Sequence, residues 1–305
     1  MEYHEFKDAI CNNMKEIMGD KARVEIHTIM KNNALFLDGL TVMREGKNCS
    51  PTVYINDFYE RFEKEGNMGS IMSELVNIFE ENEKNLSVDV SFFQDAMQVR
   101  KRIVYKLVNY EANEQLLQKV PHVPFLDLAI VFYCMITSDT IGNATILIYN
   151  SHMEMWNMDV QECFALACKN TPRLLKPDLQ NLRSLLDGTC FEGDETEKVH
   201  RENAAMQKEH ARQIYILTNK LKINGAACIL YTNVLKDFAE RMETDFFILP
   251  SSIHEVLLLP TDGREEGEQY KAMVQEVNAT AVATEEILSN RVYYYAREKD
   301  SIEIL

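Results

Sequence analysis

The chain has 305 residues, of which 46% are hydrophobic and 26% charged, and its formal net charge at pH 7 is −16. A chain of this length and composition can bury a sizeable core, in one large domain or two ordinary ones. Its acidic balance disfavours generic nucleic-acid binding and docking on anionic membranes, since like charges repel.

Targeting features point to the cytoplasm. The longest apolar run, residues 123–136, is too short to cross a bilayer and contains Asp127. Residues 1–20 have neither the basic nor the apolar region of a signal peptide. The seven cysteines are odd in number and form no CxxC pair, and Cys134 and Cys228 lie in apolar runs, as reduced core thiols do. We therefore expect a cytoplasmic protein without membrane association.

Residues 1–85 predict a helix–three-strand–helix unit. Apolar side chains recur at helical spacing in residues 1–20, at Phe6, Ile10, Met14 and Ile17. A tight turn is predicted at Asn32-Asn33, within a series of three strands over residues 22–30, 34–44 and 51–56. Beyond Asn56 the apolar period becomes helical again, which predicts two helices that end near residue 85.

The main domain is predicted to begin at residue 86. Ser91 with Gln94, and Asp159 with Glu162, have the spacing of capping boxes, so a helix is expected to begin at each pair. The second of these helices is predicted to end at Asn-Thr-Pro, residues 170–172. Strands are predicted over residues 102–110, 121–136 and 144–150. The second strand contains a continuous apolar run, which is typical of a strand covered on both faces.

The last third of the chain alternates strands and helices. Residues 176–212 contain an acidic run and little apolar periodicity, which predicts an exposed helical or mobile insertion. Strands are then predicted over residues 214–219, 225–231, 245–250 and 255–260. A helix capped by Thr232 separates the second of these strands from the third, so a parallel βαβ unit is expected there.

Two further elements complete the prediction. Asp262 with Glu265 has the spacing of a capping box and predicts a helix, and residues 291–305 predict a terminal hairpin. The predicted class is α+β, with a mixed β-sheet and flanking helices in residues 86–305, preceded by the smaller N-terminal unit of residues 1–85.

Segments from most of the chain carry a family resemblance. They are residues 37–62 (LDGLTVMREGKNCSPTVYINDFYERF), 121–133 (PHVPFLDLAIVFY), 146–175 and 225–260. Together they resemble a family of uncharacterised proteins from anaerobic Firmicutes, common in gut clostridia. A more distant family from bacilli has a similar Trp-Glu-Ala-Asn pattern and a similar terminal strand–helix–strand. The resemblance implies a cytoplasmic bacterial protein with a two-part α+β fold, and no activity comes with it.

The sequence lacks the common catalytic signatures. Walker A, GxGxxG, HExxH and GxSxG motifs are all absent. No cofactor and no metal site is therefore predicted, and the absence favours a non-catalytic protein over an enzyme.

Residues 251–255, Ser-Ser-Ile-His-Glu, form a polar centre between two apolar runs that each end in proline. His254 as base, with Ser251 or Ser252 as nucleophile and Glu255 beside it, would suit a hydrolase. Members of a catalytic triad usually come from separate elements, however, and adjacent side chains of an extended segment face opposite ways. The interpretation we favour is a turn between two core strands, in which the serines bond to the backbone.

A second candidate site follows the strand predicted at residues 144–150. His152, Glu154 and Trp156 lie at a strand-to-helix passage, where ligand sites are common. A metal ion would need a further ligand, such as His122 or His254. The alternative is that Trp156 belongs to the core and His152 caps the helix.

A third candidate is Asp127, with His122 nearby in the sequence. A carboxylate in an apolar run needs a partner when it is buried. Asp127 is therefore either part of a histidine–carboxylate site, a hydrogen-bond anchor, or an exposed residue at a bend. Cys228 lies in an apolar run without the access that a nucleophile needs, so we expect it in the core.

Three functions stay open from the sequence. The first is a non-catalytic interaction or regulatory protein with a protein partner. The second is a hydrolase-like or metal-assisted enzyme that uses the three histidines His122, His152 and His254 with Asp127 or Glu255. The third is a small-ligand-binding protein, whose pocket would combine an apolar lining with a few convergent polar groups.

Overall fold

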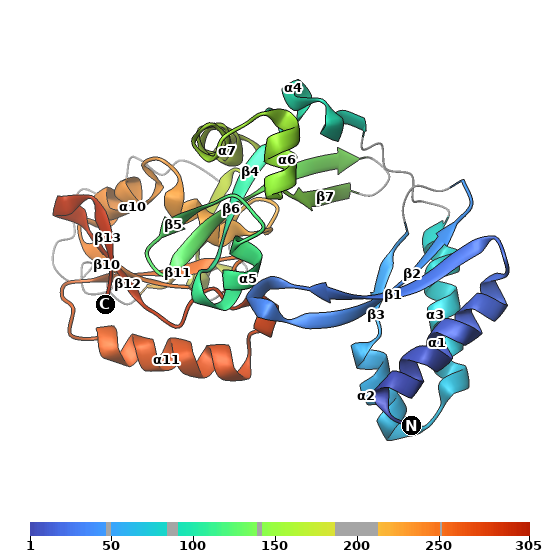
Figure 1. Ribbon diagram of the computed structural model, residues 1–305. Coiled ribbons are helices and arrows are strands. Elements are labelled where there is room, and N and C mark those ends of the chain that lie inside the picture. The colour runs from blue at the N-terminus through green and yellow to red at the C-terminus, as the bar shows by residue number, and fades with distance from the viewer. Residues whose placement is uncertain (47–49, 84–90, 139–141, 187–212, 251) are drawn as a thin grey trace. The chain divides into compact units, whose positions relative to one another are not determined.

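The computed structural model describes residues 1–46, 50–83, 91–138, 142–186, 213–250 and 252–305. The chain divides into two compact units (Figure 1). Unit 1 comprises Met1–Asp95 and Met135–Thr145, and unit 2 comprises Ala96–Cys134 and Ile146–Leu305. Helices and strands occur in both, so the predicted α+β class is confirmed. Most of the predicted insertion, residues 187–212, and Ser251 lie outside the described residues.

Unit 1 contains a three-stranded antiparallel sheet in the order β1-β2-β3, with helix α1 packed against β1 and α3. Its elements are α1 (Tyr3–Met18), β1 (Ala22–Met30), η1 (Asn32–Ala34), β2 (Phe36–Arg44), β3 (Thr52–Tyr54), α2 (Asn56–Glu65), α3 (Met68–Glu83) and η2 (Ser91–Gln94). The predicted helix, three strands and two helices are therefore confirmed. They were predictable because the apolar residues of this region follow helical or strand periods.

The apolar face of α1 forms part of the core of unit 1. Phe6, Ile10 and Met14 are completely buried, as the helical spacing predicts. The prediction that Ile17 shares this face is wrong, since its side chain is 53% exposed. The last turn of α1 packs Met18 against the core instead.

A buried carboxylate ties α1 to the β1–β2 hairpin. Asp38 on β2 accepts hydrogen bonds from Thr28 Oγ1 at 2.5 Å, Tyr3 Oη at 2.9 Å and Lys7 Nζ at 3.0 Å. Burial alone would raise the pKa of Asp38, but hydrogen bonds from Thr28, Lys7 and Tyr3 outweigh it and lower the pKa below its ordinary value of 3.8. The charged form of this carboxyl group therefore stabilises unit 1.

Two sheets organise the strands that follow. One contains β4 (Ile103–Asn109), β5 (His122–Phe125), β6 (Leu128–Ser138) and β7 (Gly142–Leu147), and the division between the units passes through β6 and β7. The other has the order β13-β12-β10-β11-β9-β8 and contains β8 (Pro177–Asn181), β9 (Tyr215–Asn219), β10 (Asp245–Leu249), β11 (Val256–Thr261), β12 (Tyr293–Ala296) and β13 (Ser301–Ile304). The strand pairs whose register the structure describes are antiparallel.

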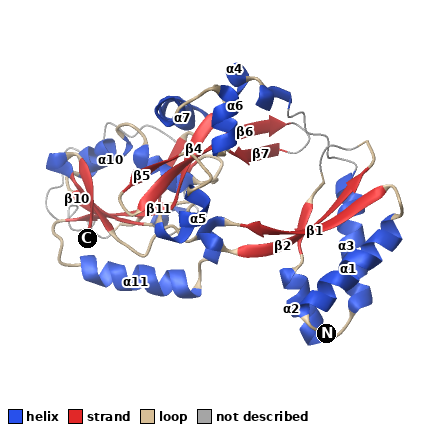
Figure 2. Ribbon diagram, viewed as in Figure 1, coloured by secondary structure: helices blue, strands red, loops and turns tan. Residues whose placement is uncertain are grey.

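Helices of unit 2 surround these sheets (Figure 2). They are α4 (Ala96–Val99), η3 (Glu111–Asn113), α5 (Glu114–Leu117), α6 (Asn150–Trp156), α7 (Val160–Leu174), α8 (Leu182–Leu186), η4 (Gly225–Leu230), α10 (Val234–Met242), α11 (Gly267–Thr280), η5 (Thr284–Glu286) and η6 (Arg297–Lys299). None of the helices in the described ranges is long and apolar enough to cross a membrane.

Helices α10 and α11 cover opposite faces of the six-stranded sheet. Phe246 on β10 packs against Phe238 of α10, with ring centroids 4.9 Å apart. The next residue, Phe247, packs against Tyr270 of α11 at 5.1 Å. Because successive side chains of a strand point to opposite faces, the two helices lie on different sides of β10. This double cover explains why the four residues of β10 that follow Asp245 are apolar and buried.

The predicted single strand at residues 121–136 is instead a hairpin. β5 pairs with β6 in antiparallel register, from His122 opposite Val131 to Phe125 opposite Leu128. The turn at Leu126-Asp127 places Leu126 at φ 55°. The prediction was wrong because this turn lacks the glycine or asparagine that usually marks a hairpin.

The predicted strand at residues 225–231 is also wrong. Gly225–Leu230 forms the 3-10 helix η4, so the expected parallel βαβ unit does not form. Five consecutive residues of η4, from Gly225 to Ile229, are buried. A short apolar run without alternation does not distinguish a buried strand from a buried helical turn, which explains the error.

Helix boundaries were predicted with mixed success. The Asp159 cap is confirmed, since its Oδ1 accepts a hydrogen bond from Glu162 N at 2.7 Å. The predicted end at residues 170–172 is wrong, and α7 continues to Leu174. Proline removes only one donor from the helix, and buried Thr171 holds this turn by accepting from Tyr105 N on β4 and donating to Ala167 O.

Later boundaries shift for local reasons. Asn233 rather than Thr232 lies at the N-cap position of helix α10, and α11 begins at Gly267 rather than near Asp262. Asp262 lies in a turn closed by hydrogen bonds between Thr261 Oγ1 and Gly263. Within the predicted insertion, Pro177–Asn181 forms the edge strand β8, whose polar sequence has no apolar alternation.

Candidate functional site

His122 and Asp127 lie at opposite ends of strand β5 and its turn. His122 Nδ1 is 3.1 Å from the carbonyl oxygen of Val120, and its ring contacts the Tyr110 ring edge-on at 5.9 Å. Asp127 accepts hydrogen bonds from two other residues, Ser289 Oγ at 2.6 Å and Tyr293 Oη at 2.7 Å. The carboxylate thus anchors the β5–β6 turn to strand β12, as one of the alternatives for Asp127 predicts.

His152 and Trp156 form part of a ring stack on α6. The rings of His152 and Trp156 are 5.7 Å apart, and Tyr149 N donates a hydrogen bond to His152 Nδ1 at 3.1 Å. His152 therefore caps the start of α6, while Trp156 is buried. Burial lowers the pKa of His152 below its ordinary value of 6.5. Glu154 is exposed on the same helix.

The three histidines do not share a site. His122, His152 and His254 each have a different hydrogen-bond partner: Val120 O, Tyr149 N and Asn224 N, respectively. Among the residues that the structure describes, no three His, Cys, Asp or Glu side chains are grouped so that they could hold a metal ion. The shared histidine–metal centre of the second hypothesis therefore has no support in this geometry.

The predicted polar centre is a tight connection between β10 and β11. We call residues 252–255 the polar loop. Its Ser252 Oγ accepts a hydrogen bond from His254 N at 3.0 Å, so the serine hydroxyl bonds to the backbone of the turn itself. Ser252 N donates to Glu255 O at 3.3 Å. The favoured interpretation, a turn whose serine bonds to the backbone, describes this loop well.

Hydrogen bonds hold the polar loop against η4 and β9. Thr218 Oγ1 donates to His254 O at 2.8 Å, and Ala226 N donates to Ile253 O at 3.2 Å. Gly225 lies so close that a Cβ atom there would be 2.2 Å from Thr218 Oγ1 and 2.4 Å from His254 O. Only glycine fits between these groups without a shift of backbone.

The ring of His254 is also held by the fold. Asn224 N donates a hydrogen bond to His254 Nδ1 at 3.2 Å, so Nδ1 carries no proton and Nε2 is the protonated nitrogen of the neutral ring. Nε2 lies 3.6 Å from Glu286 Oε1, and the side chain is 36% exposed. The nitrogen that could act as a base is therefore already a hydrogen-bond acceptor for the backbone.

Cys228 lies in η4, the 3-10 helix that packs against the polar loop. Its thiol is buried and donates to Thr218 O at 3.1 Å. Burial raises the pKa of Cys228 to about 12. A thiol with this pKa and no access is a core group, as the sequence predicts.

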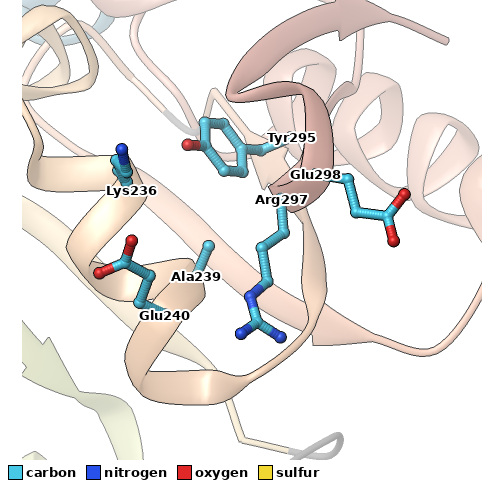
Figure 3. Close-up of a pocket in the computed structure, with 6 residues that line it drawn as sticks. All are labelled: Lys236, Ala239, Glu240, Tyr295, Arg297 and Glu298. Atoms are coloured by element: carbon cyan, nitrogen blue, oxygen red, sulfur yellow. The ribbon is translucent and has the colours of Figure 1, made fainter.

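A pocket opens at a different place, between α10 and the end of β12. We call it the charged pocket (Figure 3). It has a volume of about 380 Å³ and is lined by Lys236, Ala239, Glu240, Tyr295, Arg297 and Glu298. This volume is at the small end of the roughly 300–1,000 Å³ that small-molecule sites occupy. The lining combines two cationic and two anionic side chains with one aromatic ring.

The floor of the charged pocket is rigid. The Tyr295 ring stacks on Phe246 with centroids 4.8 Å apart and an interplanar angle of 17°, and Phe246 packs on Phe238 of α10. The Tyr295 hydroxyl donates to Asp300 Oδ1. Burial, together with this hydrogen bond and the charge of Asp300, raises the pKa of Tyr295, so its hydroxyl stays protonated.

The four charges of the pocket are not equally neutralised. Lys236 Nζ lies 3.9 Å from Asp300 Oδ2. Figure 3 shows the Glu240 and Arg297 side chains on either side of Ala239, while the Glu298 carboxylate points away from them. Within the described ranges, neither the Glu240 carboxylate nor the Arg297 guanidinium makes an ion pair. These two opposite charges are therefore available to a ligand.

Sequence reasoning missed the charged pocket. Lys236 and Glu240 are four residues apart on a predicted helix, which indicates an ordinary solvated pair. Arg297 and Glu298 lie in the predicted terminal hairpin turn, where charged residues are common. Only the packing of that turn beside α10 brings the two pairs together.

The fold and these sites define an α+β protein with two features: a polar loop whose Ser252 and His254 side chains are hydrogen-bonded to the backbone, and a small charged pocket. Residues 3–297 match the family described as "Family of unknown function (DUF5688)". The chain belongs to this family, since the match covers nearly its whole length. No curated protein and no solved structure is detectably similar to the chain.

Proposed function

We propose that the protein is a non-catalytic binding protein that takes a small charged ligand in the charged pocket. The observation that carries this proposal is the pairing of a preformed pocket of about 380 Å³ with two opposite charges, Glu240 and Arg297, that make no ion pair in the described part of the chain. A rigid aromatic floor and a few polar groups are typical of ligand sites.

The polar loop supports the non-catalytic part of the proposal. Ser252 Oγ and His254 Nδ1 both accept hydrogen bonds from backbone N–H groups. A Ser–His pair would instead need the hydroxyl to donate to the ring. These side chains therefore stabilise the connection between β10 and β11. The proposal also includes a cytoplasmic location, which is compatible with the five free cysteines of the described chain.

Ligand-induced stabilisation tests the proposal. Small cations, anions, zwitterions and neutral polar molecules would be screened against the full chain by thermal unfolding. A ligand present at ten times its Kd stabilises the folded state by about 1.4 kcal/mol, which raises Tm by a few degrees. We expect one class to raise the Tm of the wild type and not that of the double variant Glu240→Gln/Arg297→Gln.

The control is Arg23→Gln/Glu276→Gln, which removes the same charges from residues outside the pocket. It should respond to the ligand as the wild type does. The proposal is wrong if no class stabilises the wild type, or if the pocket variant responds equally.

A second candidate function is acid–base catalysis at the polar loop. His254 Nε2 carries the proton of the neutral ring, lies 3.6 Å from Glu286 Oε1 and belongs to a side chain that is 36% exposed, so a substrate at this edge would meet His254 as hydrogen-bond donor and Glu286 as base. Hydrolysis of chromogenic esters and phosphodiesters, lost in both His254→Gln and Glu286→Gln, would support catalysis. Activity that survives both changes would exclude these two residues from it.

The protein partner expected from the sequence stays a prediction. Co-purification of the full chain from its native host tests it. A partner retained by the wild type and lost in the pocket double variant would place that interaction at the charged pocket.

A further inference from the structure

The charged pocket also contains information about the class of its ligand. This step rests on the proposed function, because it takes the pocket as a binding site. The wall formed by α10 contributes Lys236 and Glu240, and the wall formed by the end of β12 and η6 contributes Arg297 and Glu298. Both walls therefore present both signs of charge.

Internal contacts reduce this set to one usable cation and one usable anion. Asp300 lies beside Lys236 and neutralises part of its charge. The Glu298 carboxylate points away from the other charged groups (Figure 3). Glu240 and Arg297 are left on opposite walls, and no ion pair to either is made by the residues described in the structure.

The backbone around Arg297 is fixed, although none of the described residues forms an ion pair with its side chain. Arg297 N donates to Asp245 Oδ1 at 2.8 Å, and the same carboxylate accepts a hydrogen bond from Tyr294 Oη at 2.5 Å. The guanidinium therefore extends from a rigid position on the rim. A planar guanidinium binds a carboxylate through two parallel hydrogen bonds, which makes a carboxylate the matching ligand group.

Long-range charge favours a ligand without net charge. The chain carries a formal net charge of −16, so a free anion is repelled before it reaches Arg297. A molecule that has both an ammonium and a carboxylate group meets no net repulsion. Its ammonium group matches Glu240, and its carbon skeleton can lie on Ala239 and the Tyr295 ring.

We infer that the charged pocket binds a small zwitterion of amino-acid or dipeptide size, with its carboxylate on Arg297 and its ammonium group on Glu240. The volume of about 380 Å³ accommodates a molecule of this size and excludes a nucleotide-sized ligand from full enclosure. No covalent step is involved.

A blocked-ligand series tests the inference on the full chain. The probes are alanyl-alanine, its N-acetyl form, which lacks the ammonium group, and its C-terminal amide, which lacks the carboxylate. Binding would be measured by calorimetry and by shifts of protein NMR resonances. We expect alanyl-alanine to bind the wild type at least about tenfold more tightly than either blocked form, because each loses one charge-assisted hydrogen-bonding group.

Matched variants assign each ligand group to its residue. Arg297→Gln should abolish the preference for the free carboxylate and keep the preference for the free ammonium group. Glu240→Gln should do the reverse. Arg23→Gln and Glu276→Gln should change neither preference, and the NMR spectra of all four variants report whether the fold is intact.

The outcomes separate this inference from the proposed function. Equal binding of all three probes at the pocket overturns the zwitterion assignment, and so does an absence of alanyl-alanine binding up to about 1 mM, which corresponds to a binding free energy of about −4 kcal/mol. If another charge class then stabilises the wild type and not Glu240→Gln/Arg297→Gln, the pocket is still a binding site. If no class does, the proposed function is also wrong.

Discussion

The polar loop and the charged pocket belong to the same unit, yet they use their polar side chains in opposite ways. In the polar loop, Ser252 Oγ and His254 Nδ1 are hydrogen-bonded to the backbone. In the charged pocket, Glu240 and Arg297 make no ion pair within the described residues. Serine and histidine, the residue types that suggest catalysis in the sequence, therefore stabilise the fold here. The side chains that are available for binding are Glu240 and Arg297, which look like ordinary surface charges in the sequence.

Burial explains the difference. A buried polar group must be hydrogen-bonded, since an unpaired one costs about 1–3 kcal/mol. The carbonyl of His254 and the hydroxyl of Thr218 lie in such an environment and are paired with each other. A solvated charge loses little when it has no protein partner. Groups that remain available to a ligand are thus found on the rim of a pocket rather than in a packed turn.

The largest expected effect comes from Gly225→Ala in the segment under the polar loop. A Cβ atom at this position would lie 2.2 Å from Thr218 Oγ1 and 2.4 Å from His254 O, so backbone must move. We expect a loss of about 3 kcal/mol in the free energy of unfolding, as for other overpacked sites. Urea denaturation measures it.

Gly69→Ala is the matched control for that change. Gly69 lies in α3, where the nearest atom to an added Cβ is Asn67 Oδ1 at 3.5 Å. Alanine there should stabilise the protein by about 0.4–1 kcal/mol, because it reduces the conformational entropy of the unfolded chain at a position where a Cβ atom fits. If both alanines have the same effect, the polar loop is not tightly packed on η4 and the comparison with the pocket loses its basis.

A smaller loss is expected for Thr218→Val. The change keeps the shape of the side chain and removes the hydrogen bond of 2.8 Å to His254 O. The free energy of unfolding should fall by about 1–2 kcal/mol, since the carbonyl is left without this donor. Thr280→Val, at an exposed hydroxyl on α11, should change it by less than about 0.5 kcal/mol. Similar losses at both positions would argue against a structural role of the loop.

His152 adds a pH-dependent contribution to the stability of the protein. The pKa of His152 is lowered by burial, so the folded state binds a proton less readily than the unfolded state. Its contribution to stability is fully present above the ordinary pKa of 6.5 and is lost as the pH falls through the lowered pKa. We expect this effect to be smaller than that of Thr218→Val, because the ring is only partly buried.

Trp156 provides the measurement for His152. It is the only tryptophan of the chain, and its ring lies 5.7 Å from that of His152. An imidazolium ring quenches neighbouring indole fluorescence, so the emission should titrate with a midpoint below pH 6.5. His152→Gln should abolish the titration. A midpoint at or above 6.5 would show that burial does not control this histidine.

Much of the fold was predictable because many segments have a local apolar period. The strands β1 and β10 and the hairpin β12–β13 all lie where the sequence predicts them. Prediction failed where tertiary contacts decide the local structure. The η4 segment is helical because its small residues pack against β9, and the Leu126-Asp127 turn is held by the hydroxyls of Ser289 and Tyr293.

The candidate sites were less predictable for a related reason. The sequence indicates correctly that residues around His254 form a turn between two strands, since prolines and serines have local preferences. The availability of Glu240 and Arg297 depends on which of the described residues each side chain contacts in three dimensions. No spacing or composition in a single sequence contains this information, because the two residues are 57 positions apart and belong to different elements.

The smallest expected effect is at the pocket itself. Arg297→Gln should change the free energy of unfolding by less than about 0.5 kcal/mol, because its contacts with the described residues are through the backbone, from its N–H to Asp245 Oδ1 and from Asp300 N to its carbonyl oxygen. The comparison is Arg264→Gln, whose guanidinium packs over the Tyr294 ring at 4.1 Å and pairs with Glu303. This second arginine should be measurably destabilising when replaced, since it loses both a ring contact and an ion pair. Equal losses at the two arginines would mean that the fold uses the Arg297 charge as well, and the distinction between an occupied polar loop and an available pocket would fail.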